Sequence, residues 1–183
     1  MKKTMITALT LAIGLLASAQ AKAQNIGFVD MTLLERKMTA YQGIIAQRDK
    51  TVKAYTKKFQ EIEQKLKEEE MSIGADKDKL SQAEVGKRID AFKAKVETFR
   101  AQQEEFAKQM QNALLTALKE IQDKAVTPVL ESVAKEKKYD AILNLNQALY
   151  VDQKNNVTDE VVAKVNAKLP KVDMPKINLS ATK

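Results

Sequence analysis

The sequence predicts an α+β protein that is mainly α, with a long antiparallel coiled-coil hairpin arm on a small β body that oligomerisation completes. Three observations lead to this fold class. Apolar residues repeat with coiled-coil spacing over about 100 residues. Strand-like segments lie only on either side of that repeat. Only five Gly and three Pro interrupt the 183 residues, which disfavours a loop-rich β fold.

Residues 1–23 have the pattern of a secretory signal peptide. Lys2 and Lys3 precede the apolar run Met5–Leu16, and Ala21-Lys22-Ala23 offers a cleavage site, with residues 17–19 as a second choice. The apolar run is too short for a membrane span, so we rank an N-terminal membrane anchor below cleavage.

Removal of residues 1–23 takes away three lysines and lowers the formal charge from +7 to +4. The pattern therefore predicts export, with cleavage near Ala23 and residence in a bacterial periplasm. The absence of Cys suits such an oxidising compartment, because no wrong disulfide can form.

The arm is predicted over residues 32–117, with its turn at about 75–76. Apolar residues alternate at spacings of four and three on two limbs, which is the pattern of a left-handed coiled coil. Gly74 suits a helix C-cap, Asp76 or Asp78 could cap the next helix, and Ser81-Gln-Ala-Glu84 matches a capping box.

A register in which paired residue numbers add up to 151 brings the two apolar limbs together. It places Phe59 against Phe92 and Tyr55 against Val96. The same register pairs Arg48 with Gln103 in one polar layer of the arm. We favour a role for this layer in fixing the register, and the alternative is a point at which the arm bends.

The body is predicted from residues 24–31 and 118–169. A short strand spans 25–30, and a kink or a fresh helix is expected at Thr127-Pro128. Residues 139–145 and 148–152 have the pattern of a β-hairpin. Thr158 is expected to cap a short helix that Pro170 ends, and residues 170–183 to form a flexible tail.

Such a body has a very small core with unpaired strand edges, so we expect several copies to close it together. The residues predicted to form this oligomerisation body are Ile26, Phe28, Val29, Ile142, Leu143, Leu149, Tyr150 and Val151.

The middle of the arm is locally cationic. We expect its basic residues, taken together, to attract an acidic client or anionic lipid, although each one alone more often only solvates a helix. They are Arg48, Lys50, Lys53, Lys57, Lys58, Lys87, Arg88, Lys93, Lys95 and Arg100.

The composition disfavours an enzymatic function. The chain has no His and no Cys, which removes the usual nucleophile–base pairs and zinc ligands, and no acidic pair lies in an apolar pattern. We therefore expect no catalytic residue, no metal site and no cofactor. Export and the scarcity of aromatic residues argue against nucleic acid as a partner. A purely structural role as a coiled-coil spacer would explain the apolar repeat, but it would leave the β body unexplained.

The order of segments resembles the Skp (OmpH-like) family of periplasmic chaperones. The resemblance rests on residues 26–31, the helical hairpin, residues 133–143, Asn146–Tyr150 and residues 157–161. It implies a homotrimer whose arms surround a cavity and hold unfolded outer-membrane β-barrel proteins without ATP. Lipopolysaccharide is a further partner that the resemblance implies. The rival hypothesis is a non-catalytic envelope scaffold that grips a folded partner through its arms.

Overall fold

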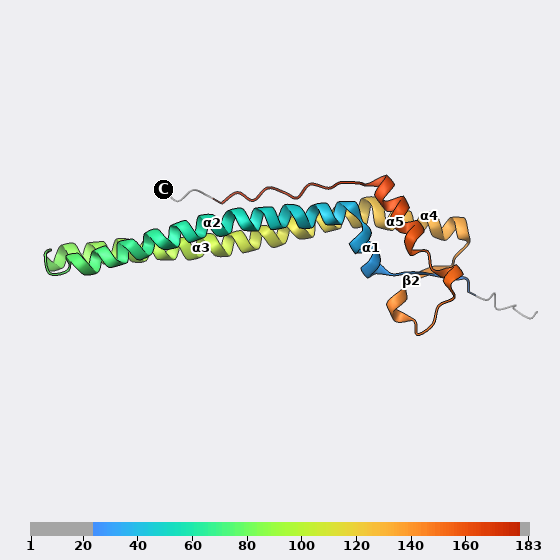
Figure 1. The fold of residues 1–183 in the computed structure, drawn as a ribbon, viewed down its shortest axis with the longest axis horizontal. Helices are drawn as coiled ribbons and strands as arrows, with labels where there is room; N and C mark the ends of the chain where they lie inside the picture. Colours follow the sequence, from blue (N-terminus) through green and yellow to red (C-terminus); the bar gives the residue numbers. More distant parts are fainter. Residues whose placement is uncertain (1–23, 180–183) are drawn as a thin grey trace, which may run out of the picture.

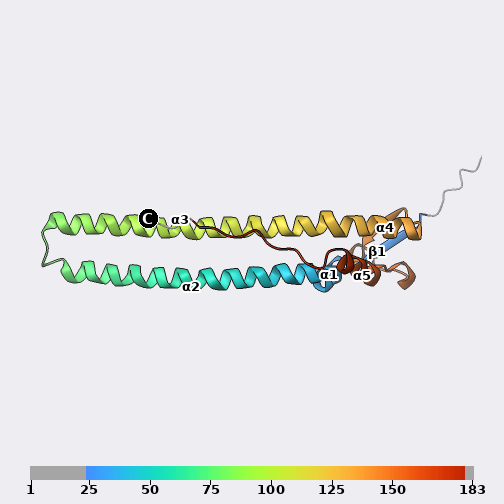
Figure 2. The same ribbon diagram turned by 90° about the horizontal axis from the view of Figure 1, so that it is seen from above.

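The protein is a rod with a small body at one end (Figure 1). The structure is a computed structural model and describes residues 24–179, so the predicted signal peptide lies outside the described residues. Viewed from above, two long helices run antiparallel along the rod (Figure 2). The predicted helical hairpin and the mainly α class of the fold are confirmed. None of the described helices is long and apolar enough to cross a membrane.

The arm consists of α2, Thr39–Asp76, and α3, Gln82–Ile121. A helix of 40 residues is roughly 60 Å long. The predicted capping box begins α3: the Ser81 hydroxyl accepts the Glu84 N–H at 3.3 Å, and the Glu84 carboxylate accepts the Ser81 N–H at 3.0 Å. This reciprocal pair satisfies two N–H groups that the helix itself leaves without partners.

The turn of the arm lies later than predicted, over residues 77–81. Gly74 is not a C-cap but lies within α2, and neither Asp76 nor Asp78 caps α3. A single interior glycine costs a helix only about 1 kcal/mol. The contacts of a long helix offset that cost, so α2 continues to Asp76.

The predicted register is also wrong, by between one and two heptads. Phe59 contacts Phe99 and Phe106, with ring centroids 5.9 and 5.6 Å apart, in place of Phe92. Tyr55 stacks on Phe106 at 4.6 Å in place of Val96. Apolar positions recur at steps of four and three on both helices, so such a slip brings apolar positions opposite one another again. The heptad pattern is therefore compatible with both registers.

The predicted polar layer is lost with that register. Arg48 is half-buried and pairs with Asp49 at 2.8 Å, whereas Gln103 is exposed on α3. The two side chains therefore do not form one layer across the arm.

The returning helix passes Pro128 without a break. A π-helical segment, Gln122–Val126, joins α3 to α4, Thr127–Lys137. Pro128 has no N–H to donate, and the wider π turn before it takes up the irregularity. Thr127 does not cap a fresh helix, because its hydroxyl accepts from the Gln122 side chain at 2.9 Å.

The sheet has two strands in the described chain. β1, Ile26–Val29, runs parallel to β2, Ala141–Asn144, with Ile26 opposite Ala141. The predicted β-hairpin is wrong: a 3₁₀ turn at Leu145–Gln147 follows β2, and residues 148–152 form no strand. β1 takes the place beside β2, which leaves 148–152 unpaired within the described residues.

The core of the body is helical, although we expected it to consist of strand residues. Two further helices, α1, Met31–Lys37, and α5, Thr158–Lys168, pack near the base of the arm. The largest fully buried side chains are Leu34, Ile44, Val126, Val133, Val161 and Val165. Burying a Val or Leu side chain stabilises a fold by about 1.5–3 kcal/mol, so this cluster anchors the arm to the body.

Thr158 does not cap α5 as predicted; Val157 holds that position. The Thr158 hydroxyl instead accepts the Asp30 N–H at 2.8 Å and donates to the Asn156 side chain at 2.6 Å. Asp159 and Glu160 lie in the first helical turn, where they complement the helix dipole. The hydroxyl thus ties α5 to the end of β1.

Residues 170–179 do not form the flexible tail that the sequence predicts. After α5 the chain turns back and runs extended along the arm (Figures 1 and 2). Val172 is only 4% exposed and belongs to the core cluster of the body. We call residues 170–179 the tail.

Candidate functional site

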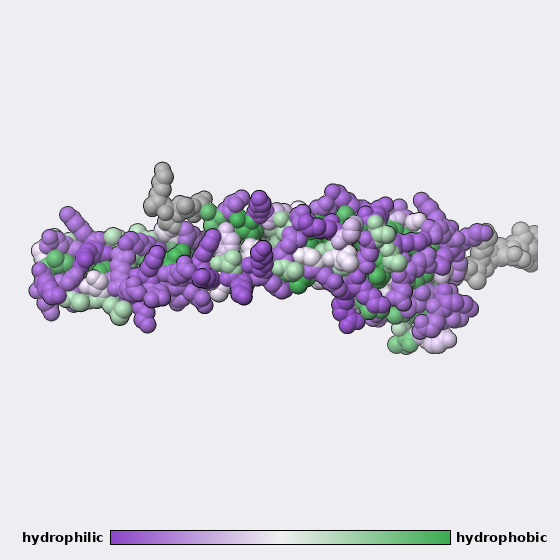
Figure 3. Space-filling view, turned by 45° about the horizontal axis from the view of Figure 1, so that its top comes forward, coloured by the Kyte–Doolittle hydropathy of each residue, from purple (hydrophilic) through white to green (hydrophobic). Residues whose placement is uncertain are grey.

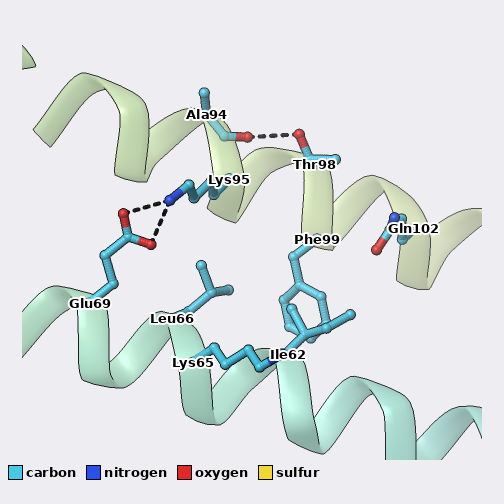
Figure 4. A pocket seen from close by; sticks show the side chains of 9 residues that line it. All are labelled: Ile62, Lys65, Leu66, Glu69, Ala94, Lys95, Thr98, Phe99 and Gln102. Carbon is cyan, nitrogen blue, oxygen red and sulfur yellow. Dashed lines mark hydrogen bonds and ion pairs between the residues drawn. The ribbon is translucent and has the colours of Figure 1, made fainter. Parts of the chain in front are cut away.

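An open cleft of about 450 Å³ lies between α2 and α3 (Figure 4). Its apolar surface comes from Ile62, Leu66 and Phe99. At one side, Lys95 of α3 reaches Glu69 of α2, with its Nζ 2.7 and 2.8 Å from the two carboxylate oxygens. The cleft offers apolar surface bordered by charge, which suits weak binding of an apolar side chain.

Aromatic rings fill the interior of the arm next to this cleft. Tyr55, Phe59, Phe99 and Phe106 contact one another with centroids 4.6–6.0 Å apart. All four are half-buried, so the arm has only a thin apolar interior. A helical pair of this kind leaves apolar edges in contact with solvent along its length.

Half of the ten basic residues predicted to attract clients are engaged in ion pairs within the arm. Five of them form ion pairs with acidic residues of the arm: Arg48 with Asp49, Arg88 with Asp76, Lys93 with Asp90, Lys95 with Glu69, and Arg100 with Glu97. The Lys58 ammonium lies 4.9 Å from the centre of the Tyr55 ring. Lys50, Lys53, Lys57 and Lys87 are exposed and make no ion pair within residues 24–179. Lys50, Lys53 and Lys57, on α2, with Lys58 beside them, form a smaller basic group than predicted.

Two ion-pair groups fix local geometry. The hydrogen bond from Arg88 holds the pKa of the Asp76 carboxyl below its ordinary value, at the end of the arm. In the body, the pKa of Glu160 is lowered chiefly by a hydrogen bond from Lys137, whose own pKa is raised by the same contact. Lys164 joins Glu160 at 3.3 Å and links α5 to Glu136 on α4. These groups are partly exposed to solvent, and we assign them a positioning role between helices.

The body exposes apolar side chains at the segment that failed to form a strand. Leu149 and Tyr150 are 109% and 85% exposed, and Leu143 of β2 is 40% exposed. Ile26, Phe28, Ile142 and Val151 are half-buried, and of the eight predicted body residues only Val29 is buried. A space-filling view shows apolar patches on both the body and the arm within a largely hydrophilic surface (Figure 3).

The arm also binds the tail through two glutamines that the sequence analysis missed. Gln47 of α2 bonds the Val172 C=O and the Met174 N–H, each at 2.9 Å. Gln109 of α3 bonds both the C=O and the N–H of Asn178, at 3.1 and 2.9 Å. The alternation of Val172 and Met174 with polar residues was the available signal for an extended segment lying on a surface. Nothing in the sequence indicates which surface.

Within residues 24–179, no group of three or more acidic side chains is placed to hold a metal ion. Half of the described acidic residues form ion pairs. Glu84 and Glu136 also accept hydrogen bonds from the hydroxyls of Ser81 and Ser132 on their own helices or caps.

Residues 25–165 match the sequence profile of the family described as outer membrane protein (OmpH-like). This match spans β1, the whole arm and most of α5. The chain belongs to the OmpH-like family. A crystal structure of a proposed OmpH-like outer membrane chaperone from Caulobacter crescentus CB15 has the same fold, with a TM-score of 0.77 and 13% sequence identity. The likeness covers 85% of this chain and 92% of that one. No curated protein matches the sequence.

The OmpH-like match ends at residue 165, before the tail begins. The family therefore accounts for the hairpin arm and the body, and membership supports a chaperone role for these two parts. The tail along the arm is a feature that the family match does not cover.

Proposed function

We propose that this protein is an ATP-independent holdase chaperone of the periplasm. Its client is an unfolded outer-membrane β-barrel protein, which it keeps from aggregating in a cavity between the helical arms of a homotrimer. Family membership and the arm's open apolar surface bordered by charge support this proposal. Anionic lipid or lipopolysaccharide is a second ligand class that the basic group on α2 would attract.

The observation that carries the proposal is the combination of a long, thin arm with an apolar surface that no described part of the body covers. Many weak apolar and charged contacts hold an unfolded chain without one tight pocket, and their individual weakness allows release without ATP. Lys50, Lys53 and Lys57 add apolar stems with charged ends to that surface.

An aggregation assay tests this function. A denatured outer-membrane barrel protein is diluted from urea, and light scattering is recorded with and without equimolar trimer. We expect clear suppression of scattering. The double variant Lys53→Gln/Lys57→Gln should weaken suppression of an acidic client about twofold to fivefold, since each exposed charge contributes modestly.

The matched control is Lys135→Gln/Lys168→Gln, which removes the same charge from exposed positions of the body. It should suppress scattering as well as the unchanged protein. An unchanged protein that gives no protection would reject the holdase function. Capture of a folded envelope protein without protection of the denatured one would favour the scaffold hypothesis instead.

A further inference from the structure

The tail contacts the arm through its backbone. Six hydrogen bonds join the two within the described residues: those of Gln47 and Gln109, one from the Thr39 hydroxyl to the Pro170 C=O at 3.0 Å, and one from the Tyr55 hydroxyl to the Ile177 C=O at 3.1 Å. Every tail atom in these bonds is a main-chain N–H or C=O. Each glutamine supplies one donor and one acceptor, as a neighbouring β-strand would.

The side chains of the tail alternate between the arm and solvent. Val172 is buried, and Met174, Ile177 and Leu179 are half-buried, whereas Asp173, Lys176 and Asn178 are exposed. The alternation skips one residue at the exposed Pro175, which has no N–H to pair with a further strand. The arm therefore binds an extended chain that has apolar side chains on one face.

Backbone recognition of this kind is tolerant of sequence. The bonds of Gln47 and Gln109 would form with any extended residue other than proline at the same place, and only the inward side chains need to be apolar. Strands of membrane β-barrels have this alternation over about ten residues. An unfolded barrel strand is thus the class of partner whose chemistry fits the surface beneath the tail.

We propose that the face of the arm bearing Gln47, Tyr55 and Gln109 is a binding site for extended polypeptide, and that the tail occupies it as a built-in competitor of client strands. This inference rests on the proposed holdase function, because it names the part of the arm that holds a client segment. The tether places the tail at an effective concentration of about 1 mM. A tail with an intrinsic Kd of ~0.1 mM would then weaken client binding about tenfold.

The test measures binding of a fluorescent ten-residue peptide that alternates Val with Thr, by anisotropy, to the full-length mature chain. Ile177→Asp/Leu179→Asp releases the tail by placing charge against the arm and leaves the site itself intact. Gln47→Met/Gln109→Met keeps side-chain volume and removes the four glutamine bonds. Lys176→Asp is the control, since it changes the formal charge by the same two units at an exposed tail position.

We expect Ile177→Asp/Leu179→Asp to bind the peptide about tenfold more tightly than the unchanged chain and than Lys176→Asp. Gln47→Met/Gln109→Met should bind it at least tenfold more weakly than Ile177→Asp/Leu179→Asp, because several neutral hydrogen bonds are lost. Hydrogen exchange at the Met174 and Asn178 amides should be slow in the unchanged chain and in Lys176→Asp, and fast in both double variants.

Equal peptide affinity of the unchanged chain and Ile177→Asp/Leu179→Asp, with the tail amides exchanging fast in the latter, would overturn the competition. Equal affinity of the two double variants would overturn the site. If Lys176→Asp gained as much peptide affinity as Ile177→Asp/Leu179→Asp, the gain would be due to charge. That result would also overturn the competition by the tail. The scattering assay is scored separately. If the protein suppresses aggregation but shows none of these changes in peptide affinity, only this inference is rejected. If the affinity changes occur without suppression of aggregation, only the holdase function is rejected.

Discussion

At the scale of single residues, Gly27 shows how closely the small sheet is packed. A Cβ at Gly27 would lie 2.7 Å from two ring carbons of Tyr139 and 3.3 Å from Ile142. The ring of Tyr139 rests on the bare backbone of β1, and this close approach is the reason for a glycine in the strand.

Gly27→Ala should therefore destabilise the body by about 1–3 kcal/mol, the usual cost of forcing extra volume into a packed site. Urea unfolding followed by circular dichroism measures this change. Gly43→Ala is the control, because a Cβ there meets nothing within 4 Å and the residue lies inside α2. It should stabilise the protein by about 0.5–1 kcal/mol. Destabilisation of similar size in both variants would contradict the close packing at Gly27.

At the scale of elements, the register of α2 against α3 is the feature that most needs an independent measurement. Phe59 contacts Phe106 in the structure, whereas the sequence pattern alone pairs Phe59 with Phe92. The arm's half-buried aromatic rings provide a direct way to distinguish the two arrangements, since only rings in contact are energetically coupled.

A double-mutant cycle of Phe59→Leu and Phe106→Leu should give a coupling free energy of about 0.5–1.5 kcal/mol, as expected for an aromatic pair in edge contact. The cycle of Phe59→Leu with Phe92→Leu should give a value within about 0.5 kcal/mol of zero. Thermal and urea unfolding of the single and double variants supply both values. A larger coupling in the second cycle would restore the register predicted from sequence.

The elements also show where sequence reasoning worked. The capping box at Ser81 depends on residues three apart, and the structure forms it as predicted. Gly74 carried an equally plausible end signal, yet it lies inside the helix. A glycine or a helix cap changes the free energy of a helix by only about 1 kcal/mol. The many interhelical contacts of the arm therefore decide at which of these residues the helix ends.

At the scale of the whole molecule, the exposed residues at 148–152 call for a partner. Leu149 and Tyr150 are 109% and 85% exposed in the single chain, and one edge of β2 has no partner strand within residues 24–179. Isolated two-stranded sheets are marginally stable, and strands from other copies would cover these side chains.

Leu149→Asp/Tyr150→Asp should convert the proposed trimer to monomer at micromolar concentration, because two charges would be buried in each interface. Light scattering coupled to size exclusion measures the mass. Met71→Asp is the control: Met71 is 59% exposed near the far end of the arm and should leave the mass unchanged. A monomeric mass for the unchanged chain would refute the trimer itself.

The sequence by itself determined the class of the fold and the antiparallel arm, because coiled-coil periodicity and helix caps are local patterns with a direct structural meaning. It also led to the family through the order of its segments. Only the tertiary structure decided the register of the arm, the loss of the polar layer between Arg48 and Gln103, and the position of the tail. A slip between two coiled-coil registers preserves the apolar pattern, and a tail bound through its backbone leaves little trace in the sequence. These features therefore depend on contacts between residues far apart in the chain.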